Sequence, residues 1–275
     1  MAPHDRDVKF EHLKKLIGSY GSLLVAFSGG VDSTFVLKVA RDVLGKEQVK
    51  AVTARSESLS SREFEESIAL AREIDVDQIV IRTQELEKPG DRENSPERCY
   101  FCKEELYERL SELKETLGAR VIANGINCDD LSDVRPGIQA AKDFGIRSPL
   151  LEAGFSKEDV RHFSRVLGLP TWDKPALACL SSRIPHGEEV TPEKLRQIEQ
   201  GEEALWALGF RNVRLRHHGK TARIEVEKEE LSKFFDPELR EKIVVSLKAI
   251  GFLYITLDLE GYRQGSLNET KVTPL

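Results

Sequence analysis

The residues with the clearest chemical signature form a short glycine-rich turn, Ser28-Gly-Gly-Val-Asp-Ser33. Gly29 and Gly30 let the backbone approach a ligand and expose its N–H groups, and the helix expected after the turn adds the positive end of its dipole. The serines at either end add hydroxyl donors. The turn therefore predicts a phosphate site. Asp32 would repel phosphate there unless a cation lay between them. We therefore predict that Asp32 helps to hold a Mg²⁺ ion bound to a pyrophosphate group.

Cysteines form a second group with chemical potential: Cys99, Cys102, Cys128 and Cys179. Arg98-Cys-Tyr-Phe-Cys-Lys103 sets two thiols three positions apart beside two cations, which favour thiolate. The spacing is compatible with a redox pair, with part of a zinc site or with inert thiols, although a four-cysteine zinc site usually needs two such pairs. We favour an iron–sulfur cluster held by Cys99, Cys102 and Cys179, because three ligands would leave one iron open to sulfide.

Three arginines follow in the second half of the chain. Arg183 lies four residues after Cys179 and is a candidate catalytic residue that orients the substrate or stabilises a thiolate. Arg214 and Arg216 alternate on a predicted strand, so their side chains face the same side. Two guanidinium groups on one face suit a substrate phosphate, although they are also compatible with an ordinary exposed strand face.

A polar loop after a predicted strand supplies further candidates. Gly125-Ile-Asn-Cys-Asp-Asp130 begins it, and Asp133 continues it. We assign Gly125 to the ATP site. We assign Asp129, Asp130 and Asp133 to substrate binding, although acidic loop residues are often only solvated.

Elements that would position these residues alternate between strand and helix through the first 125 residues. Such alternation predicts a doubly wound parallel α/β sheet, with ligands beyond the carboxyl ends of its strands. We expect helices around residues 35–43, 64–71, 103–117 and 156–167, the last capped by Ser156. The expected strands are Leu23–Phe27, Val49–Thr53, Gln78–Ile81 and Arg120–Ala123.

The last third of the chain predicts a smaller α/β region. Ala207-Leu-Gly-Phe210 and Ala249-Ile-Gly-Phe252 each end a helical stretch and lead into an alternating strand, and Ala222–Val226 is a third strand. Residues 169–190 have little periodicity. We therefore expect a nucleotide domain over residues 1–187 and a substrate-binding or oligomerisation domain over residues 188–275.

Composition excludes some classes of function. The 275 residues carry 41 basic and 47 acidic side chains, a net charge of −6, which gives no global attraction to nucleic acid. No apolar run approaches the ~20 residues that span a bilayer, and the amino terminus lacks the apolar stretch of a signal peptide. We expect a cytoplasmic protein with reduced thiols.

The chain resembles the LarE-type ATP-dependent sulfur transferases of nickel-pincer nucleotide synthesis. The glycine-rich turn alone resembles the wider superfamily of PP-loop ATP pyrophosphatases, and the segments after Asp133 single out the family. The resemblance runs from about Leu13 to Glu269. It is carried by Val25–Ser33, Gly125–Asp130, Asp133–Gly137, Ser148–Glu152, Trp172–Pro175, Ala178–Pro185, Val213–Arg216, Ala222–Glu225 and Leu257–Arg263.

This resemblance implies a reaction. Members adenylate a carboxylate of pyridinium-3,5-dicarboxylate mononucleotide with Mg-ATP, release pyrophosphate and AMP, and form a thiocarboxylate. Some sacrifice the sulfur of the cysteine that matches Cys179, whereas those with three cysteines use a 4Fe–4S cluster carrying sulfide. The Arg98–Lys103 segment places this chain with the second kind, and Cys128 has no assigned role.

Other functions share parts of this pattern. A tRNA-thiolating PP-loop enzyme has the loop and the three cysteines, but the acidic charge argues against it. An ammonia-using adenylating synthetase needs no cysteine cluster. The resemblance further implies a small-molecule nucleotide substrate, a sulfide or other sulfur donor, and a homo-oligomer.

Overall fold

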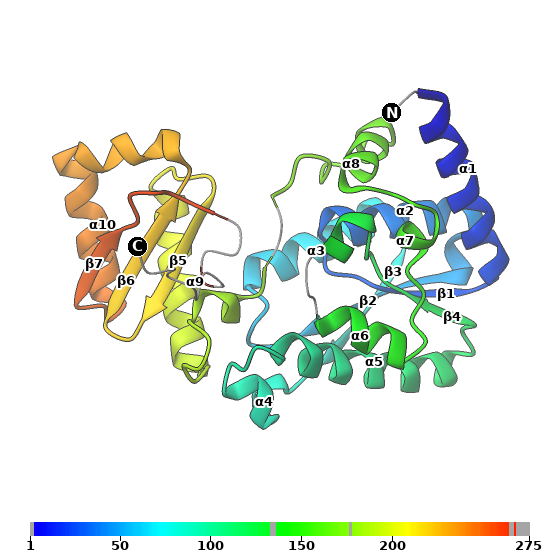
Figure 1. The fold of residues 1–275 in the computed structure, drawn as a ribbon, viewed down its shortest axis with the longest axis horizontal. Coiled ribbons are helices and arrows are strands. Elements are labelled where there is room, and N and C mark those ends of the chain that lie inside the picture. The colour runs from blue at the N-terminus through cyan, green and yellow to red at the C-terminus, as the bar shows by residue number, and fades with distance from the viewer. Residues whose placement is uncertain (1–2, 133–135, 176–177, 264–266, 268–275) are drawn as a thin grey trace. The chain divides into compact units, whose positions relative to one another are not determined.

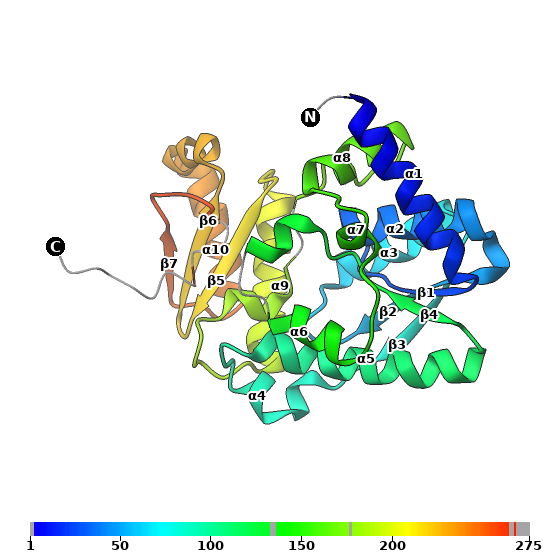
Figure 2. The ribbon, with the colours of Figure 1, turned by 45° about the vertical axis from the view of Figure 1, so that its right-hand side comes forward.

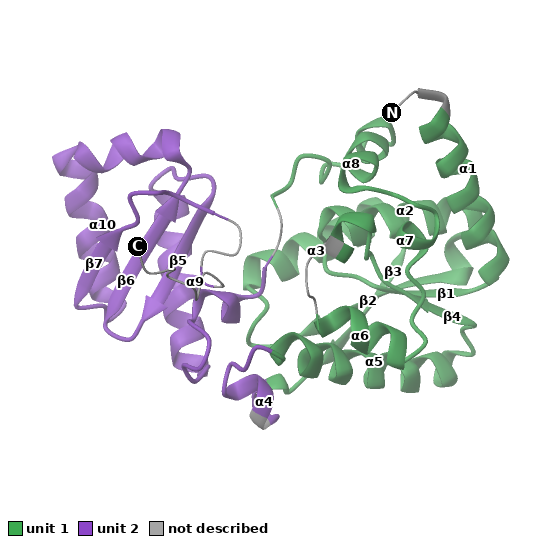
Figure 3. Ribbon diagram, viewed as in Figure 1, with its two compact units in different colours: residues 1–85, 97–177 green, residues 86–96, 178–275 purple. Residues whose placement is uncertain are grey.

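The computed structural model describes residues 3–132, 136–175, 178–263 and 267 (Figure 1). The chain divides into two compact units, coloured separately in Figure 3. The first comprises residues 1–85 and 97–177, and the second comprises residues 86–96 and 178–275. The functional domains expected from the sequence, 1–187 and 188–275, stay a prediction, because compactness does not test which residues work together.

The first unit contains the predicted parallel sheet. Its strands are β1 (Leu23–Ala26), β2 (Val49–Arg55), β3 (Asp77–Arg82) and β4 (Val121–Ala123), in the order β3-β2-β1-β4. Leu23 lies opposite Val49 on one side and Val121 on the other, and all three strand pairs are parallel. The chain order reverses between β1 and β4, so the doubly wound α/β fold is confirmed.

Helices cover both faces of this sheet (Figures 1 and 2). Leu23 and Val25 of β1 join the core beneath α1 (Pro3–Tyr20), α2 (Val31–Leu44), α3 (Ser61–Glu73) and α8 (Lys157–Val166). Leu24 joins a separate core with α5 (Arg98–Leu117) and α6 (Pro136–Asp143). Alternate strand residues therefore point to opposite cores, which explains the continuous apolar runs in the sequence.

Two helices differ from the sequence-based expectation. The sequence predicted nothing before Leu23, yet α1 packs there through Leu13 and Ile17. The spacing of Phe10, Leu13 and Ile17 is that of an apolar helix face and would have revealed it. Helix α5 begins at Arg98, a turn and a half before the expected residue 103, so both cysteines of the pair belong to this helix.

The remaining elements are short. Helical turns also occur within residues 85–97 and 127–132, two polar segments that have no apolar periodicity to reveal them. Ser156 caps α8 as predicted, in a capping box with Asp159. The short elements are η1 (Lys46–Gln48), η2 (Glu85–Glu87), α4 (Pro89–Arg92), η3 (Cys128–Ser132), α7 (Pro149–Glu152), η4 (Leu180–Arg183) and η5 (Lys228–Phe235).

The second unit has its own sheet, in the order β5-β6-β7. Strands β5 (Val213–His218) and β6 (Thr221–Val226) are antiparallel, and β7 (Tyr254–Leu257) runs parallel to β6. Helices α9 (Pro192–Ala207) and α10 (Pro237–Ala249) share its core. Gly201 lets α9 approach β5, since a Cβ there would lie 2.5 Å from Leu215 Cδ1. The second, smaller α/β region is confirmed.

Residues 86–96 join this second unit although they are distant in sequence from the rest of it. Asn94 is fully buried, and its amide donates to the carbonyl oxygens of Ile184 (3.0 Å) and Pro185 (2.7 Å). The N–H of Val190 donates to the Arg92 carbonyl oxygen at 2.8 Å. These hydrogen bonds to backbone carbonyl oxygens satisfy polar groups that burial would otherwise leave unpaired.

His217 is buried on β5 against Phe252. Its Nε2 lies 3.0 Å from the Oε1 of Gln197, which requires a proton on Nε2, and its buried Nδ1 has no partner among the described residues. Burial, followed by the charge of Lys194, lowers the pKa of His217 to about 4. Protonation would place a charge in a buried position near the Lys194 ammonium, which is the physical reason for the shift.

We predict that His217→Phe reduces the pH dependence of folding stability. As pH falls, an unfolded histidine protonates near 6.5 and the folded one only near 4. Stability that is fully present above pH 6.5 is therefore lost between 6.5 and 4, by at most about 3 kcal/mol. Urea unfolding of wild type and variant across this range measures the difference. Parallel stability curves would contradict the prediction.

Candidate active site

The glycine-rich turn lies at the switch point of the parallel sheet. It follows the carboxyl end of β1 and leads into α2, whose N-cap is Gly30. Because Gly30 has no side chain, the first N–H groups of α2 are left for an anion. The hydroxyls of Ser28 and Ser33 lie 3.2 Å apart, and the Gly30 N–H donates to Ser28 Oγ at 3.3 Å. The predicted phosphate-binding groups are thus gathered at one point.

Gly29 has a left-handed φ of 69° and packs against α3, where a Cβ would lie 3.2 Å from Ser67 Cβ. The Lys174 ammonium donates to the Gly29 carbonyl oxygen at 3.2 Å and pairs with Glu66 at 2.8 Å. Arg161 donates to the Lys174 carbonyl oxygen at 2.8 Å and so holds that segment in place. The turn is therefore fixed by contacts from two elements distant in sequence.

Gly125 approaches the turn from the end of β4. A Cβ at this position would lie 2.8 Å from the backbone nitrogen of Ser33 and 3.0 Å from Asp32 Cβ. Only glycine allows two backbones to come this close. The parallel pairing of β1 with β4 places both loops at the same sheet edge. The assignment of Gly125 to the ATP site stays a prediction.

Asp32 lies in the first turn of α2 and is partly accessible, with 21% of its side chain exposed. Its two oxygens accept from Asn127 Nδ2 at 3.0 Å and from the Lys157 ammonium at 2.5 Å. A carboxylate oxygen is a ligand that Mg²⁺ favours, and a cation already compensates this one. The site therefore fits the assignment of Asp32 to Mg²⁺, which stays a prediction.

Asn127 organises the acidic loop. Its Oδ1 accepts from the Asp129 N–H at 2.9 Å, and its own N–H donates to Asp130 Oδ2 at 3.0 Å. Asp129 Oδ2 also accepts from the Lys157 N–H at 2.7 Å. These bonds give both carboxylates a role in shaping the loop. Their assignment to the substrate stays a prediction, and Asp133 lies outside the described residues.

Cys99 and Cys102 occupy the first turns of α5, three residues apart and hence on one helix face. Burial acts to lower the pKa of Lys103, but Cys102 and other neighbours outweigh it and raise that pKa. Gly137 lets α6 pack close by, since a Cβ there would lie 3.1 Å from Lys103 Cγ. Two thiols beside an ammonium have the donor chemistry of an iron–sulfur site.

Cys179 belongs to the second unit, where it is exposed at the start of η4. Arg183 is buried and donates to the Cys179 carbonyl oxygen at 3.0 Å. The same guanidinium donates to both carboxylate oxygens of Glu202, at 3.0 and 3.1 Å. Arg183 thus holds the backbone that carries Cys179, while the cluster joining this thiol to Cys99 and Cys102 stays a prediction.

Arg214 and Arg216 are both nearly buried, at 8% and 5% exposed. Arg216 donates twice to Glu225 Oε2, at 3.0 and 2.7 Å, and once to the Ser182 carbonyl oxygen at 3.0 Å. Arg214 lies over the Tyr262 ring. Burial, and then repulsion from Arg183, lowers the pKa of Arg214. Several guanidinium groups are gathered here in a largely buried position, which suits an anion.

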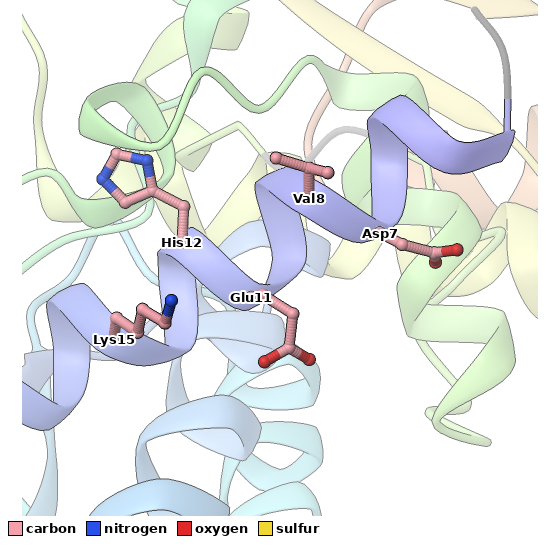
Figure 4. Close-up of a pocket in the computed structure, with 5 residues that line it drawn as sticks. All are labelled: Asp7, Val8, Glu11, His12 and Lys15. Carbon is pink, nitrogen blue, oxygen red and sulfur yellow. The ribbon is translucent and has the colours of Figure 1, made fainter.

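A hollow on the outer face of α1 is separate from the predicted nucleotide and substrate sites. Figure 4 shows that its lining comes from one helix: Asp7, Val8, Glu11, His12 and Lys15. None of these residues belongs to the predicted sites, and a single helix face does not enclose a nucleotide. In the described part of the chain, no helix is both long and apolar enough to span a membrane.

The sheet order, the glycine-rich turn at the switch point and Asp32 in the first turn of α2 define the class of protein. The protein has the fold of the PP-loop ATP pyrophosphatases. Residues 10–112, from α1 into α5, match the family described as NAD synthase.

Comparison over the whole chain gives the family. The chain is 39% identical over 246 residues to the pyridinium-3,5-bisthiocarboxylic acid mononucleotide synthase of Lactiplantibacillus plantarum, covering 90% of this chain and 88% of that protein. Uncharacterised proteins of Synechocystis sp. (48% over 260 residues; 94% and 97% covered) and Methanocaldococcus jannaschii (30% over 241 residues; 88% and 90% covered) are also similar. The chain belongs to the LarE-type family and is an ATP-dependent enzyme.

Sequence reasoning missed several residues that the structure places beside the predicted ones. They are Glu66, Asn127, Lys157, Lys174, Glu202 and Glu225. Asn127, Lys174 and Glu225 lie within segments that carry the family resemblance, which was an available signal. Lys157 stands first in a helix, where cations are disfavoured, and that anomaly was a second signal.

We predict that Gly125→Ala weakens ATP binding by about tenfold or more and destabilises the first unit by about 1–3 kcal/mol, because the methyl group overlaps the Ser33 backbone. Calorimetric ATP titration and thermal unfolding measure the two effects. Gly18→Ala is the control, since its Cβ would meet Val43 at an ordinary 3.4 Å. Unchanged ATP affinity in the Gly125 variant would remove that residue from the site.

Proposed function

We propose that this enzyme converts a carboxylate of pyridinium-3,5-dicarboxylate mononucleotide to a thiocarboxylate in nickel-pincer nucleotide synthesis. The observation that carries the proposal is the likeness, over 90% of the chain, to a relative whose name gives the bisthiocarboxylate product. The phosphate turn, the cysteine pair and the buried arginines each have a part in such a reaction.

In the first step ATP activates the carboxylate. A carboxylate oxygen of the substrate attacks the α-phosphorus, the bond to the β-phosphate oxygen breaks, and pyrophosphate leaves toward Gly29 and Gly30. Mg²⁺ held by Asp32 would offset the negative charge on the departing phosphates. The N–H groups at the start of α2 are fixed before the reaction, so they stabilise that charge without reorganising.

In the second unit, Arg214 and Arg216 bind the phosphate of the nucleotide substrate. Glu225 and Ser182 fix the Arg216 guanidinium, and the pKa of Arg214 is lowered by burial and by repulsion between cations. An incoming phosphate would relieve that repulsion. A fixed guanidinium loses little conformational entropy on binding, which favours affinity.

In the second step sulfur attacks the acyl carbon, the carbon–oxygen bond breaks, and AMP leaves with that oxygen. A 4Fe–4S cluster held by Cys99, Cys102 and Cys179 would supply the sulfide. The alternative is attack by the Cys179 thiolate itself, followed by loss of its Cα proton and cleavage of its Cβ–S bond, which leaves dehydroalanine. In both cases Arg183 holds the Cys179 backbone in position.

A direct test incubates anaerobically purified protein with Mg-ATP, sulfide and the dicarboxylate mononucleotide. We expect AMP and pyrophosphate in equal amounts and a product in which sulfur replaces carboxylate oxygen, detected by mass spectrometry. Nucleotide cleavage that requires ammonia or tRNA, with no thiocarboxylate, would reject the proposal.

The source of sulfur is tested with cysteine variants. Protein reconstituted with iron and sulfide should contain about four irons per chain and turn over repeatedly. Ala variants of Cys99, Cys102 and Cys179 should each lose iron and sulfur transfer but retain pyrophosphate release. Cys128→Ala is the control and should keep both. Iron-free protein that loses the mass of one hydrogen sulfide at Cys179 would favour the sacrificial route instead.

If Arg214 and Arg216 bind the substrate phosphate, removing one of them should weaken substrate binding selectively. Arg214→Met should weaken binding of the mononucleotide by about tenfold or more, because it removes one charge-assisted contact, and should leave ATP binding unchanged. Arg216 is less suitable for the test because its removal would leave Glu225 with one cation fewer. Titration with each nucleotide separately distinguishes the effects. Equal weakening of both would argue against the assignment.

A further inference from the structure

The ammonium of Lys157 lies on the carboxylate assigned to Mg²⁺. Its Nζ is 2.5 Å from Asp32 Oδ2, and the two residues are 125 positions apart. The side chains are 32% and 21% exposed, so both are accessible to a ligand. Asn127 donates to the other Asp32 oxygen at 3.0 Å and fixes the plane of the carboxylate. The contact therefore lies at the first turn of α2, next to the predicted phosphate turn.

Helix stability does not account for a lysine at this position. Ser156 and Asp159 form the capping box of α8, and Glu158 and Asp159 give its first turn the expected negative charge. Lys157 precedes them at the positive end of the helix dipole, where a cation is unfavourable by about 0.3–1 kcal/mol. The ion pair with Asp32 offsets that cost.

The position of the Lys157 backbone is well defined. Its N–H donates to Asp129 Oδ2 at 2.7 Å. Asp159, two residues later, is almost fully buried and pairs with Arg6 and Lys9 of α1, each at 3.1 Å. Substituting the Lys157 side chain leaves all of these contacts in place. Its flexible stem allows the ammonium to move while the backbone stays fixed.

We propose that Lys157 is a built-in counter-cation of the ATP site. Its ammonium neutralises Asp32 before the metal arrives, and it moves onto ATP phosphate oxygens when Mg²⁺ takes the carboxylate. The proposal rests on the use of ATP in the proposed function, and on no property of the acceptor substrate.

Charge explains both positions of the ammonium. Without a partner, the Asp32 carboxylate would repel the triphosphate from the helix terminus that attracts it. Paired with Lys157 it is neutral, so the nucleotide can enter without metal. A divalent cation attracts Asp32 more strongly than an ammonium does and repels that ammonium. The released Lys157 then adds a positive charge beside phosphates that Mg²⁺ only partly neutralises.

The test measures ATP binding by calorimetry, first with EDTA and then with saturating Mg²⁺. Lys157→Met should weaken metal-free ATP binding by about tenfold or more, because it leaves Asp32 unpaired. Asp32→Asn in the same protein should restore metal-free affinity, since it removes the repelling charge. Asp32→Asn alone should bind metal-free ATP more tightly than wild type, because Lys157 is then available to the phosphates.

A second readout needs no nucleotide. Lys157→Met should lower the thermal stability of the apo protein, and the added Asp32→Asn change should recover it. The matched control is Lys38→Met. Lys38 also lies on α2, close to Asp32 in sequence, but its ammonium pairs with Asp42 at 2.7 Å. This variant should leave metal-free ATP affinity unchanged.

Two results would overturn the inference: metal-free ATP affinity in Lys157→Met equal to that of wild type, or a loss that Asp32→Asn does not reverse. Failure of the proposed function looks different. Protein that shows this binding pattern but makes no thiocarboxylate keeps the inference and rejects the function. Wild-type protein that binds no ATP rejects both.

Discussion

The parallel pairing of β1 with β4 is the constraint on which the geometry around the glycine-rich turn depends. It brings the turn after β1 and the segment after β4 to one edge of the sheet, with Leu23 opposite Val121. The two loops then meet at a distance that only Gly125 allows. Asn127 and Asp32 make their contact as a result. Without this pairing, the residues of the phosphate turn would have no opposite wall.

Both units arrange charge in the same way. In each, a carboxylate pairs with a basic side chain near a predicted anion site: Asp32 pairs with Lys157, and Glu225 pairs with Arg216 and Arg223. Such a carboxylate lowers the cost of gathering like charges before the ligand arrives. It also fixes their geometry, so the ligand meets groups already in position.

The sequence predicted the architecture well because buried parallel strands and a glycine-rich turn have local signatures. The phosphate turn, the strand before it and the Ser156 cap could all be read from neighbouring residues. Pairings over long separations could not. Nothing near Lys157 indicates Asp32, and nothing near Arg183 indicates Glu202. Their partners depend on how helices pack, which no periodicity in a single segment encodes.

The path of the chain through residues 86–96 has a consequence for biosynthesis. This segment leaves the ribosome about ninety residues before its partners around Ile184 do. Asn94 therefore stays solvated while the rest of the first unit is translated. Domains generally fold in order of synthesis. Here the second unit closes after the first, because residues 86–96 can join it only once residues 178–263 have been made.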